Sequence, residues 1–510
     1  MNLAKNLEIS SAFFPERPAL RQEGSELTYS QFNEKANRVA TGLLSIGLRP
    51  GEYVALYAPN SIDWVVFYYG VLKAGCVAVT LSHLLTQEEL ARLLEHSRPR
   101  AIFTEASKLG VLQRLKDPEG LRKVICPDGD VDLQKLMDKG SASFEALDRD
   151  RQDTAAILYT GGTTGVPKGV MLSHESIDFS SHSIARFERS TEKDCALCFM
   201  PFNHVFGQIH IMNATVASAG CLEILQGFDM DRILEATQGG RVTKFYAVPT
   251  VYVRMLGLDD LERKLGKLRY CFSAAASMAM ETVMRWKERT KITIAESYGM
   301  TEAMPVTYNH YYRHVVGSVG QTVQAVEVQI RDEEGNPLER GKTGEICIRG
   351  PVVMKGYLKN EEGTRLAFHK DGWLRSGDVG RFDENNYLCV VDRIKDLIIT
   401  GGENVYPREV EELIYTLPEV ESCAVVGLPD KEWGERVTAF IVPRPGSRIL
   451  PDQIKSFLKS RLSPFKVPKE YFLVEDLPKS PAGKILKREL RRQFQGGFPA
   501  KTFAFGSERS

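Results

Sequence analysis

The chain lacks an excess of either charge. In its 510 residues, lysine plus arginine and aspartate plus glutamate both total 66, so the formal net charge is zero. Without a basic excess, the composition gives no reason to expect nucleic-acid binding, and without an acidic excess it gives no reason to expect disorder.

Long apolar runs are also missing. The most apolar stretch, Trp64 to Leu81, contains Lys73 and a Gly75-Cys76 break, whereas a membrane-spanning helix needs about 20 predominantly apolar residues. We therefore interpret this stretch as a helix followed by a strand and expect no transmembrane segment. The sequence leaves a peripheral membrane contact and oligomerisation open.

Cysteine pairs and targeting signals are sparse as well. The nine cysteines are scattered and odd in number, which favours free thiols in a reducing compartment. Cys195 and Cys198 form a lone C-x-x-C without nearby histidines at ligand spacing, so we interpret them as part of a core strand and not as a zinc site. The first 18 residues show no basic-then-apolar signal pattern. These features together predict a cytoplasmic protein.

What is present is an alternation of short apolar strands and amphipathic helices. Strands are expected at 53–57, 77–81 and 101–104, with a helix at 33–46 before the first strand and another at 62–74 between the first two. Such alternation is typical of βαβ units and a mostly parallel sheet, so the predicted fold class is α/β. Residues 128–152 are polar and weakly periodic, and we expect a surface excursion there.

The stretch Thr160 to Gly169 follows the strand-like run 155–159 and combines glycines, threonines and one lysine. Glycines allow backbone amides to converge on an anion, threonine hydroxyls add donors, and Lys168 adds a positive charge. The pattern predicts a loop that holds a polyphosphate; the alternative is a glycine-rich turn. A Walker A loop is excluded, because Pro167 precedes the lysine and Gly169 follows it where Ser or Thr is needed.

This stretch resembles the phosphate loop of the adenylate-forming superfamily, which includes acyl-CoA synthetases, aryl-CoA ligases, luciferases and peptide-synthetase adenylation domains. That loop usually reads T-S-G-T-T-G-x-P-K-G. The chain departs from it at Gly161, a form similar to the loop of bacterial long-chain fatty-acyl-CoA ligases. The resemblance implies phosphate contacts from Thr160, Gly161, Gly162, Thr163, Thr164, Gly165 and Lys168.

The segment 296–302 resembles a second signature of the same superfamily. Mg²⁺ prefers hard oxygen ligands and commonly takes only one or two protein carboxylates, so Glu302 fits a magnesium ligand and Thr301 a donor to the α-phosphate. In isolation the two residues would equally suit a helix cap. The resemblance implies further nucleotide contacts from Ser297, Tyr298, Gly299 and Met300, and from Ala275 in a turn where relatives usually carry glycines. Because alanines fill some of that turn, the width of the acyl pocket stays open.

His204 lies in an apolar segment. From the residues alone it is more often a packing histidine than a catalyst, but in the family this segment borders the carboxylate pocket. The resemblance therefore implies that His204 positions substrate or phosphate. The residues assigned to the acyl pocket are His204, Val205, Gly207, Gly299 and Met304.

The remaining assignments come from the resemblance. Asp378, in a glycine-bracketed turn, would accept the ribose hydroxyls, and Arg393 would contact ribose or phosphate. Lys395 would mark a hinge, and Lys484, in the segment 478–487, would swing in to hold the carboxylate and the α-phosphate. After rotation of the small domain, Gly401, Gly402 and Glu403 would line the CoA channel, with Trp433 on the CoA adenine.

These assignments predict an N-terminal AMP-binding domain at 1–392, a mobile C-terminal domain at 393–495 and a flexible tail at 496–510. The basic run Lys487, Arg488, Arg491 and Arg492 is interpreted as a solvated helix face.

The function that follows is AMP-forming ligation of a carboxylic acid to coenzyme A, with ATP and Mg²⁺. Gly161 and an apolar surround favour a medium- or long-chain fatty acid. An aryl-CoA ligase for benzoate- or cinnamate-like acids, and an adenylation module that loads a carrier protein, remain the alternatives.

Overall fold

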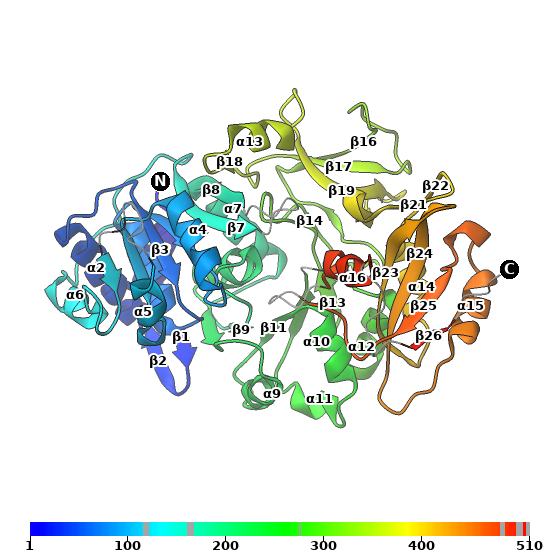
Figure 1. Cartoon of the computed structure of the whole chain (residues 1–510). Helices are drawn as coiled ribbons and strands as arrows, with labels where there is room; N and C mark the ends of the chain where they lie inside the picture. Colours follow the sequence, from blue (N-terminus) through cyan, green and yellow to red (C-terminus); the bar gives the residue numbers. More distant parts are fainter. Residues whose placement is uncertain are drawn as a thin grey trace.

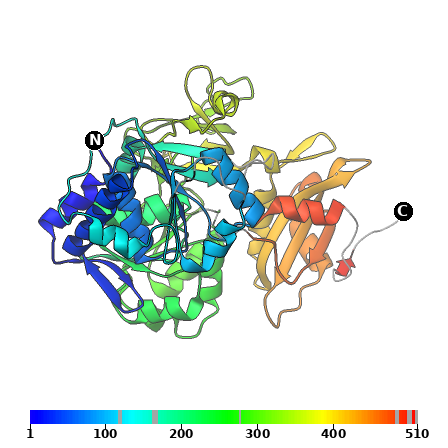
Figure 2. The same ribbon diagram turned by 60° about the vertical axis from the view of Figure 1, so that its left-hand side comes forward.

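Parallel strand–helix units build the larger, N-terminal part of the protein, and a small α+β part follows, so the predicted α/β fold class is confirmed. The computed structural model describes residues 1–115, 121, 123–160, 168–274, 276, 278–479, 485–495 and 503–505. Figures 1 and 2 show the C-terminal part, orange to red, as a separate lobe beside the rest.

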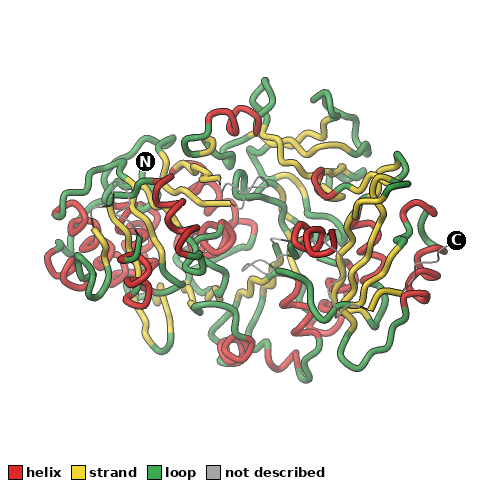
Figure 3. Tube along the Cα trace, in the orientation of Figure 1, coloured by secondary structure: helices red, strands yellow, loops and turns green. Residues whose placement is uncertain are grey.

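Two large mixed sheets lie in the N-terminal part. Their strands are among those drawn in yellow in Figure 3. The first has parallel inner pairs and an antiparallel edge. Its strand order is β18 (Gly356–Tyr357), β8 (Lys168–Ser173), β7 (Thr154–Thr160), β4 (Val77–Thr80), β3 (Tyr53–Tyr57), β5 (Ala101–Thr104) and β6 (Lys123–Ile125). The second is parallel except for its last pair, β1–β2, and runs β13 (Ile294–Glu296), β12 (Tyr270–Ser273), β11 (Lys244–Ala247), β9 (Cys195–Cys198), β10 (Cys221–Ile224), β1 (Pro18–Gln22) and β2 (Ser25–Thr28).

Helices cover these sheets and bury their apolar faces in one large core and one smaller cluster, the latter on the side of the first sheet that α4 and α5 cover. Local sequence fixes several helix starts: Thr28 and Gln31 form a capping box, as do Thr86 and Glu89, and Ser61 caps the next helix through its side chain. The helices are α1 (Lys5–Phe13), α2 (Tyr29–Ser45), α3 (Ile62–Lys73), α4 (Gln87–Ser97), α5 (Ala106–Gln113), α6 (Leu133–Lys139), α7 (His174–Phe187), α8 (Ala214–Ala217), α9 (Met230–Gln238), α10 (Pro249–Leu256), α11 (Leu261–Lys264) and α12 (Met280–Thr290), with a π-helix η1 (Phe206–Asn213).

A third, antiparallel sheet and a short ribbon connect the two parts of the chain. The sheet holds β16 (Glu327–Arg331), β17 (Gly344–Arg349), β19 (Leu374–Phe382) and β20 (Leu388–Arg393), and α13 (Glu361–Ala367) precedes β19. The ribbon pairs β14 (Thr307–Tyr308) with β15 (Gln321–Thr322).

The C-terminal part has its own buried apolar clusters, built from residues 398–490. A helix opens at Pro407, where the missing amide hydrogen of proline costs nothing because the first turn leaves that donor without a helical partner. The strands are β21 (Ile398–Thr400), β22 (Glu403–Val405), β23 (Val420–Asp430), β24 (Gly434–Pro443), β25 (Glu470–Leu473) and β26 (Phe503–Phe505); the helices are α14 (Pro407–Tyr415), α15 (Pro451–Lys459) and α16 (Lys487–Gln495), with 3₁₀ turns η2 (Ile394–Asp396) and η3 (Pro464–Lys466).

Two expectations are corrected. The segment 128–152 is not only a surface excursion, because α6 buries Leu136 and Met137 against the core. The basic helix is not simply solvated: Lys487 pairs with Glu411 at 2.8 Å and Arg491 with Asp396 at 3.1 Å, which ties α16 to neighbouring elements. As predicted, none of the described helices is long and apolar enough to cross a membrane.

Candidate active site

A β-hairpin carries the predicted phosphate loop. Strands β7 and β8 are antiparallel, and their last register pair is Thr160 opposite Lys168. The ends of the loop are therefore held together by the sheet, and Lys168 is anchored at the first position of β8. The five residues assigned to phosphate binding between them, Gly161 to Gly165, lie outside the described residues.

The edge strand β18 brings an aromatic residue beside Lys168. Tyr357 pairs with Val170 of β8, and the amide of Leu358 donates to the carbonyl of Gly169 at 2.8 Å. The Lys168 ammonium lies 4.6 Å from the centroid of the Tyr357 ring, a distance at which a cation is attracted to the ring face. The lysine is thus oriented by a ring from a distant part of the chain.

Glu302 lies at the same corner. The amide of Met354 donates to the Glu302 carbonyl at 2.7 Å, which docks the 298–306 turn beside the start of β18. The Tyr357 hydroxyl donates to Glu302 Oε1 at 2.9 Å. Burial raises the pKa of the Glu302 carboxyl, and Tyr357 and Lys168 offset only part of that effect. A buried carboxylate with incomplete positive compensation fits a site for a hard cation such as Mg²⁺.

Asp378 forms a second polar centre. It accepts a hydrogen bond from the Tyr298 hydroxyl at 2.7 Å and lies 3.4 Å from Arg393 Nε, with Asp378 and Arg393 opposite each other on β19 and β20. Its turn is fixed by Gly377, whose φ of 71° favours glycine and whose amide donates to Glu345 at 3.1 Å. Three residues predicted from separate motifs are therefore in direct contact.

The 297–304 segment folds back on itself. Ser297 Oγ donates to the Thr307 carbonyl at 2.7 Å, and the amide of Met300 donates to the Ala303 carbonyl at 2.8 Å. A Cβ on Gly299 would lie 2.9 Å from Met304 Cγ, so these two residues pack directly on each other. Thr301 is half-buried at the tip of the turn, next to Glu302.

The predicted acyl-pocket segment leads into η1. The amide of Phe206 donates to His204 Nδ1 at 3.2 Å, Val205 is buried, and His204 itself is half-buried. A Cβ on Gly207 would lie 2.4 Å from the Pro201 carbonyl oxygen. Gly207 is thus required for close backbone packing, which is a structural reason for this residue.

The predicted CoA-channel residues lie in or against the tight hairpin that connects β21 to β22, and the predicted hinge residue precedes it in the chain. Gly401 and Gly402 have φ of 60° and 83° and connect β21 to β22, as two-residue turns with two positive φ values do. The Gly401 amide donates to the Trp433 carbonyl at 2.8 Å, and the Trp433 ring packs against Gly401. Lys395 lies in η2 and Glu403 is exposed.

Two further predicted residues, Ala275 and Lys484, also lie outside the described residues. The sequence interpretation missed Tyr357, which contacts both Lys168 and Glu302. The sequence gives no local signal for this residue, because its partners are remote in sequence: Glu302 is 55 positions away.

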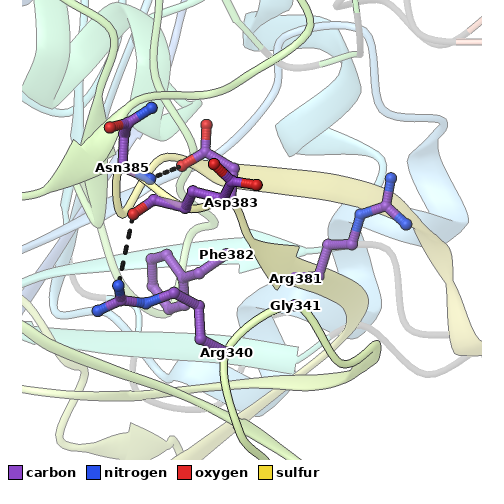
Figure 4. Close-up of a pocket in the computed structure, with 7 residues that line it drawn as sticks. Arg340, Gly341, Arg381, Phe382, Asp383 and Asn385 are labelled. Atoms are coloured by element: carbon purple, nitrogen blue, oxygen red, sulfur yellow. Dashed lines mark hydrogen bonds between the residues drawn. The ribbon is translucent and has the colours of Figure 1, made fainter.

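Two other polar groups of residues, an open cleft and a possible metal-ligand cluster, are weaker candidates for a ligand site. An open cleft of about 490 Å³ lies between the turns of the third sheet and contains none of the predicted site residues (Figure 4). Its Arg340 donates to the Glu384 carbonyl at 3.4 Å. Glu345, Cys347 and His369 have ligand atoms within 4.8 Å of one another, but Glu345 already accepts from Arg375 and from the Gly377 amide.

Comparison with known proteins adds independent findings. The family model described as AMP-binding enzyme matches residues 7–358, and the one described as AMP-binding enzyme C-terminal domain matches 409–484. The chain is 32% identical over 508 residues to 4-coumarate-CoA ligase 1 of Narcissus pseudonarcissus, covering 95% of this chain and 92% of that protein. It is 33% identical over 518 residues to Long-chain-fatty-acid–CoA ligase of Bacillus subtilis (strain 168), covering 94% and 92%. The solved structure of ATP-bound MatB from Rhodopseudomonas palustris matches with a TM-score of 0.91 and 34% identity, over 97% of this chain and 99% of that one.

Proposed function

The chain belongs to the AMP-binding enzyme family of adenylate-forming ligases, and we propose that it joins an apolar carboxylic acid to coenzyme A in two steps. In the first step, the carboxylate attacks the α-phosphorus of ATP and releases pyrophosphate, which gives an acyl-AMP. In the second, the CoA thiol attacks the acyl carbon and releases AMP. The observation that supports this most directly is the contact of Lys168, Tyr357 and Glu302 at one corner.

The first step builds negative charge on the phosphate oxygens. Lys168 and the phosphate loop would offset that charge on one side and Lys484 on the other, where it would also hold the carboxylate close to the phosphorus. Magnesium, when bound at Glu302, would supply further positive charge to the phosphates. Thr301 would donate to the α-phosphate region.

The nucleoside would be held by the second polar centre. Asp378 is already oriented by the Tyr298 hydroxyl and by Arg393, so its remaining acceptor capacity can serve the ribose hydroxyls. Ala275, Ser297, Gly299 and Met300 would line the adenine and ribose path, as the family resemblance implies.

The acyl part would extend past His204, Val205, Gly207, Gly299 and Met304. Relatives of the chain are named for a long-chain fatty acid and for 4-coumarate, so both acid classes are candidates. Gly161 favours the fatty acid, and the aryl acid is the alternative.

The second step needs access for CoA. We propose that the part from about residue 393 to 495 rotates about Lys395 and brings the Gly401–Gly402 hairpin, Glu403 and Trp433 to the thiol channel. The short glycine turn next to η2 supports this proposal, because a few terminal residues commonly absorb the dihedral change of such motions. Loading of a carrier protein is the alternative second step, and a cytoplasmic location remains a prediction.

The test of this function measures pyrophosphate release and thioester formation with fatty, aryl and amino acids, with and without CoA. A CoA-dependent thioester from an apolar acid is expected. Absence of thioester from every apolar acid would reject the ligase proposal, and transfer only to a carrier protein would favour the alternative.

A variant at Lys484 separates the two steps. Lys484→Ala should abolish acyl-AMP formation and leave thioester formation from supplied acyl-AMP largely intact. Lys479→Ala, in which a surface lysine paired with Asp476 is lost, is the matched control and should leave both steps unchanged. Equal loss of both steps in Lys484→Ala would contradict the rotation.

A further inference from the structure

A buried ionic cluster lies at the end of α7 and is not used by the proposed chemistry. Glu188, only 1% exposed, accepts hydrogen bonds from His210 Nε2 at 2.9 Å, Lys244 Nζ at 2.6 Å and the Tyr308 hydroxyl at 2.8 Å. The Tyr246 hydroxyl also donates to it. We call these five residues the Glu188 cluster.

Aromatic rings enclose this cluster on the side of η1. The Phe272 ring centroid lies 4.1 Å from that of His210 and 5.6 Å from that of Tyr308, and the Phe206 centroid lies 5.8 Å from that of Phe272. All of these rings are 2% exposed or less. The space between η1, β11, β12 and β14 is therefore filled by side chains.

The Glu188 cluster is directly continuous with the predicted acyl site. Phe206 is two residues from His204 and donates its amide to that side chain. Phe272 is two residues before Ala274, where the chain enters the turn assigned to the adenine and the acyl group. Tyr308 follows Thr307, whose carbonyl accepts from Ser297. Three separate segments of the site thus lead into the cluster, and the contacts of Phe206 with His204 and of Phe272 with Phe206 and His210 join it to the predicted acyl-binding segment.

We propose that the Glu188 cluster and Phe272 form the inner wall of the acyl site and restrict the acid to a compact one, a single ring or a short chain. This inference rests on the proposed ligase function. A long alkyl tail that continued past His204 toward these rings would have to displace Phe272 and then meet the ionised pair of Glu188 and Lys244, which already has its hydrogen-bond partners. Separating such a pair leaves a buried charge uncompensated, which a tail without polar groups cannot repair. A planar ring, in contrast, can pack edge-on or offset against Phe206 and Phe272.

The first experiment is a length series on the unmodified enzyme. Values of kcat/KM for thioester formation are measured with benzoate, cinnamate, butanoate, hexanoate, octanoate, dodecanoate and hexadecanoate. Benzoate or hexanoate should exceed dodecanoate and hexadecanoate by at least about tenfold, since one misfitting methylene in a pocket already costs that much. Higher values for dodecanoate or hexadecanoate would overturn the proposal while upholding the ligase function. Absence of thioester from every acid would instead reject the ligase function itself.

The second experiment removes the wall. Phe272→Ala should raise kcat/KM for octanoate about tenfold or more relative to benzoate, whereas dodecanoate should gain less, because its longer tail would still meet the Glu188–Lys244 pair. Phe245→Ala is the matched control: Phe245 is also fully buried, lies on the neighbouring strand β11 and packs on Tyr252 instead of His210. The control should leave the length profile unchanged. If Phe272→Ala does not fold, Phe272→Leu replaces it with a smaller expected shift. A length profile that stays the same in a folded Phe272 variant would overturn the assignment.

Discussion

Glu302 and Glu188 are both buried glutamates, yet their surroundings have opposite effects. Around Glu302, burial outweighs one tyrosine hydroxyl and a more distant lysine, so the pKa of its carboxyl is raised. Around Glu188, burial is outweighed by Lys244 and His210, and the pKa of its carboxyl falls to about 2. The difference shows that burial alone does not mark a functional carboxylate. A buried carboxylate with few partners can still bind a cation, whereas a fully partnered one stabilises the fold.

The largest effect, on the free energy of unfolding, should come from removing the charge of Glu188, whose carboxylate accepts several hydrogen bonds. Glu188→Gln leaves Lys244 as an uncompensated buried charge, which typically costs about 3–5 kcal/mol of stability. Calorimetry should show a clearly lower Tm. Glu327→Gln is the control, because the Glu327–Arg349 pair is largely exposed and should change stability by less than about 1 kcal/mol. Equal decreases of Tm in the two variants would contradict the difference proposed between the buried and the exposed glutamate.

The same glutamate predicts a pH dependence of stability. Because its pKa is lower in the folded state than the ordinary 4.5, its contribution is fully present above pH 4.5 and is lost as pH falls toward about 2. The shift corresponds to about 3 kcal/mol. Thermal unfolding of the wild type and Glu188→Gln at decreasing pH should therefore converge. A difference that does not change with pH would contradict this account.

Removing the charge of Glu302, whose side chain has fewer partners, should lower catalysis. Glu302→Gln removes the charge that fits Mg²⁺, and acyl-AMP formation should fall about 100-fold, or ~2.7 kcal/mol in activation free energy. Pyrophosphate release across a Mg²⁺ titration measures this. Glu296→Gln is the control, since that residue has the same 8% exposure but no assigned nucleotide role. Comparable loss in both variants would indicate a general structural effect.

The smallest effect on acyl-AMP formation is expected when only the hydroxyl group of Tyr357 is removed. Tyr357→Phe keeps the ring beside Lys168 and removes the donor to Glu302, so acyl-AMP formation should fall about tenfold, or ~1.4 kcal/mol. The hydroxyl lowers the pKa of Glu302, and its loss should raise that pKa. Because the ionised carboxylate is the active form, the acidic limb of the pH–rate profile should move to higher pH. An acidic limb that stays at the same pH would show that the Tyr357 hydroxyl does not influence the ionisation of Glu302.

The sequence was sufficient for features that depend on local patterns. Strand β7 and the strand at Cys195–Cys198 were predicted because their signals lie within about ten residues. Helix α6 was missed, since a helix of 7 residues is stabilised mainly by packing its buried face.

Contacts between remote segments were beyond such patterns. Tyr357 acquires its role only when β18 pairs with β8 and the 298–306 turn docks beside it. The Glu188 cluster likewise collects residues from α7, η1, β11 and β14. No spacing in the sequence links Glu188 to Tyr308, 120 positions apart.

The packing of Trp433 on the Gly401–Gly402 turn has an optical consequence. Of the four tryptophans, Trp64, Trp286 and Trp373 are at most 3% exposed, while Trp433 is 38% exposed. A soluble quencher such as acrylamide will therefore reach chiefly the indole of Trp433. This indole packs against the Gly401–Gly402 turn, within the part of the chain that is proposed to move. The protein thus carries a native fluorophore whose quenching can follow this hairpin in solution, without any added label.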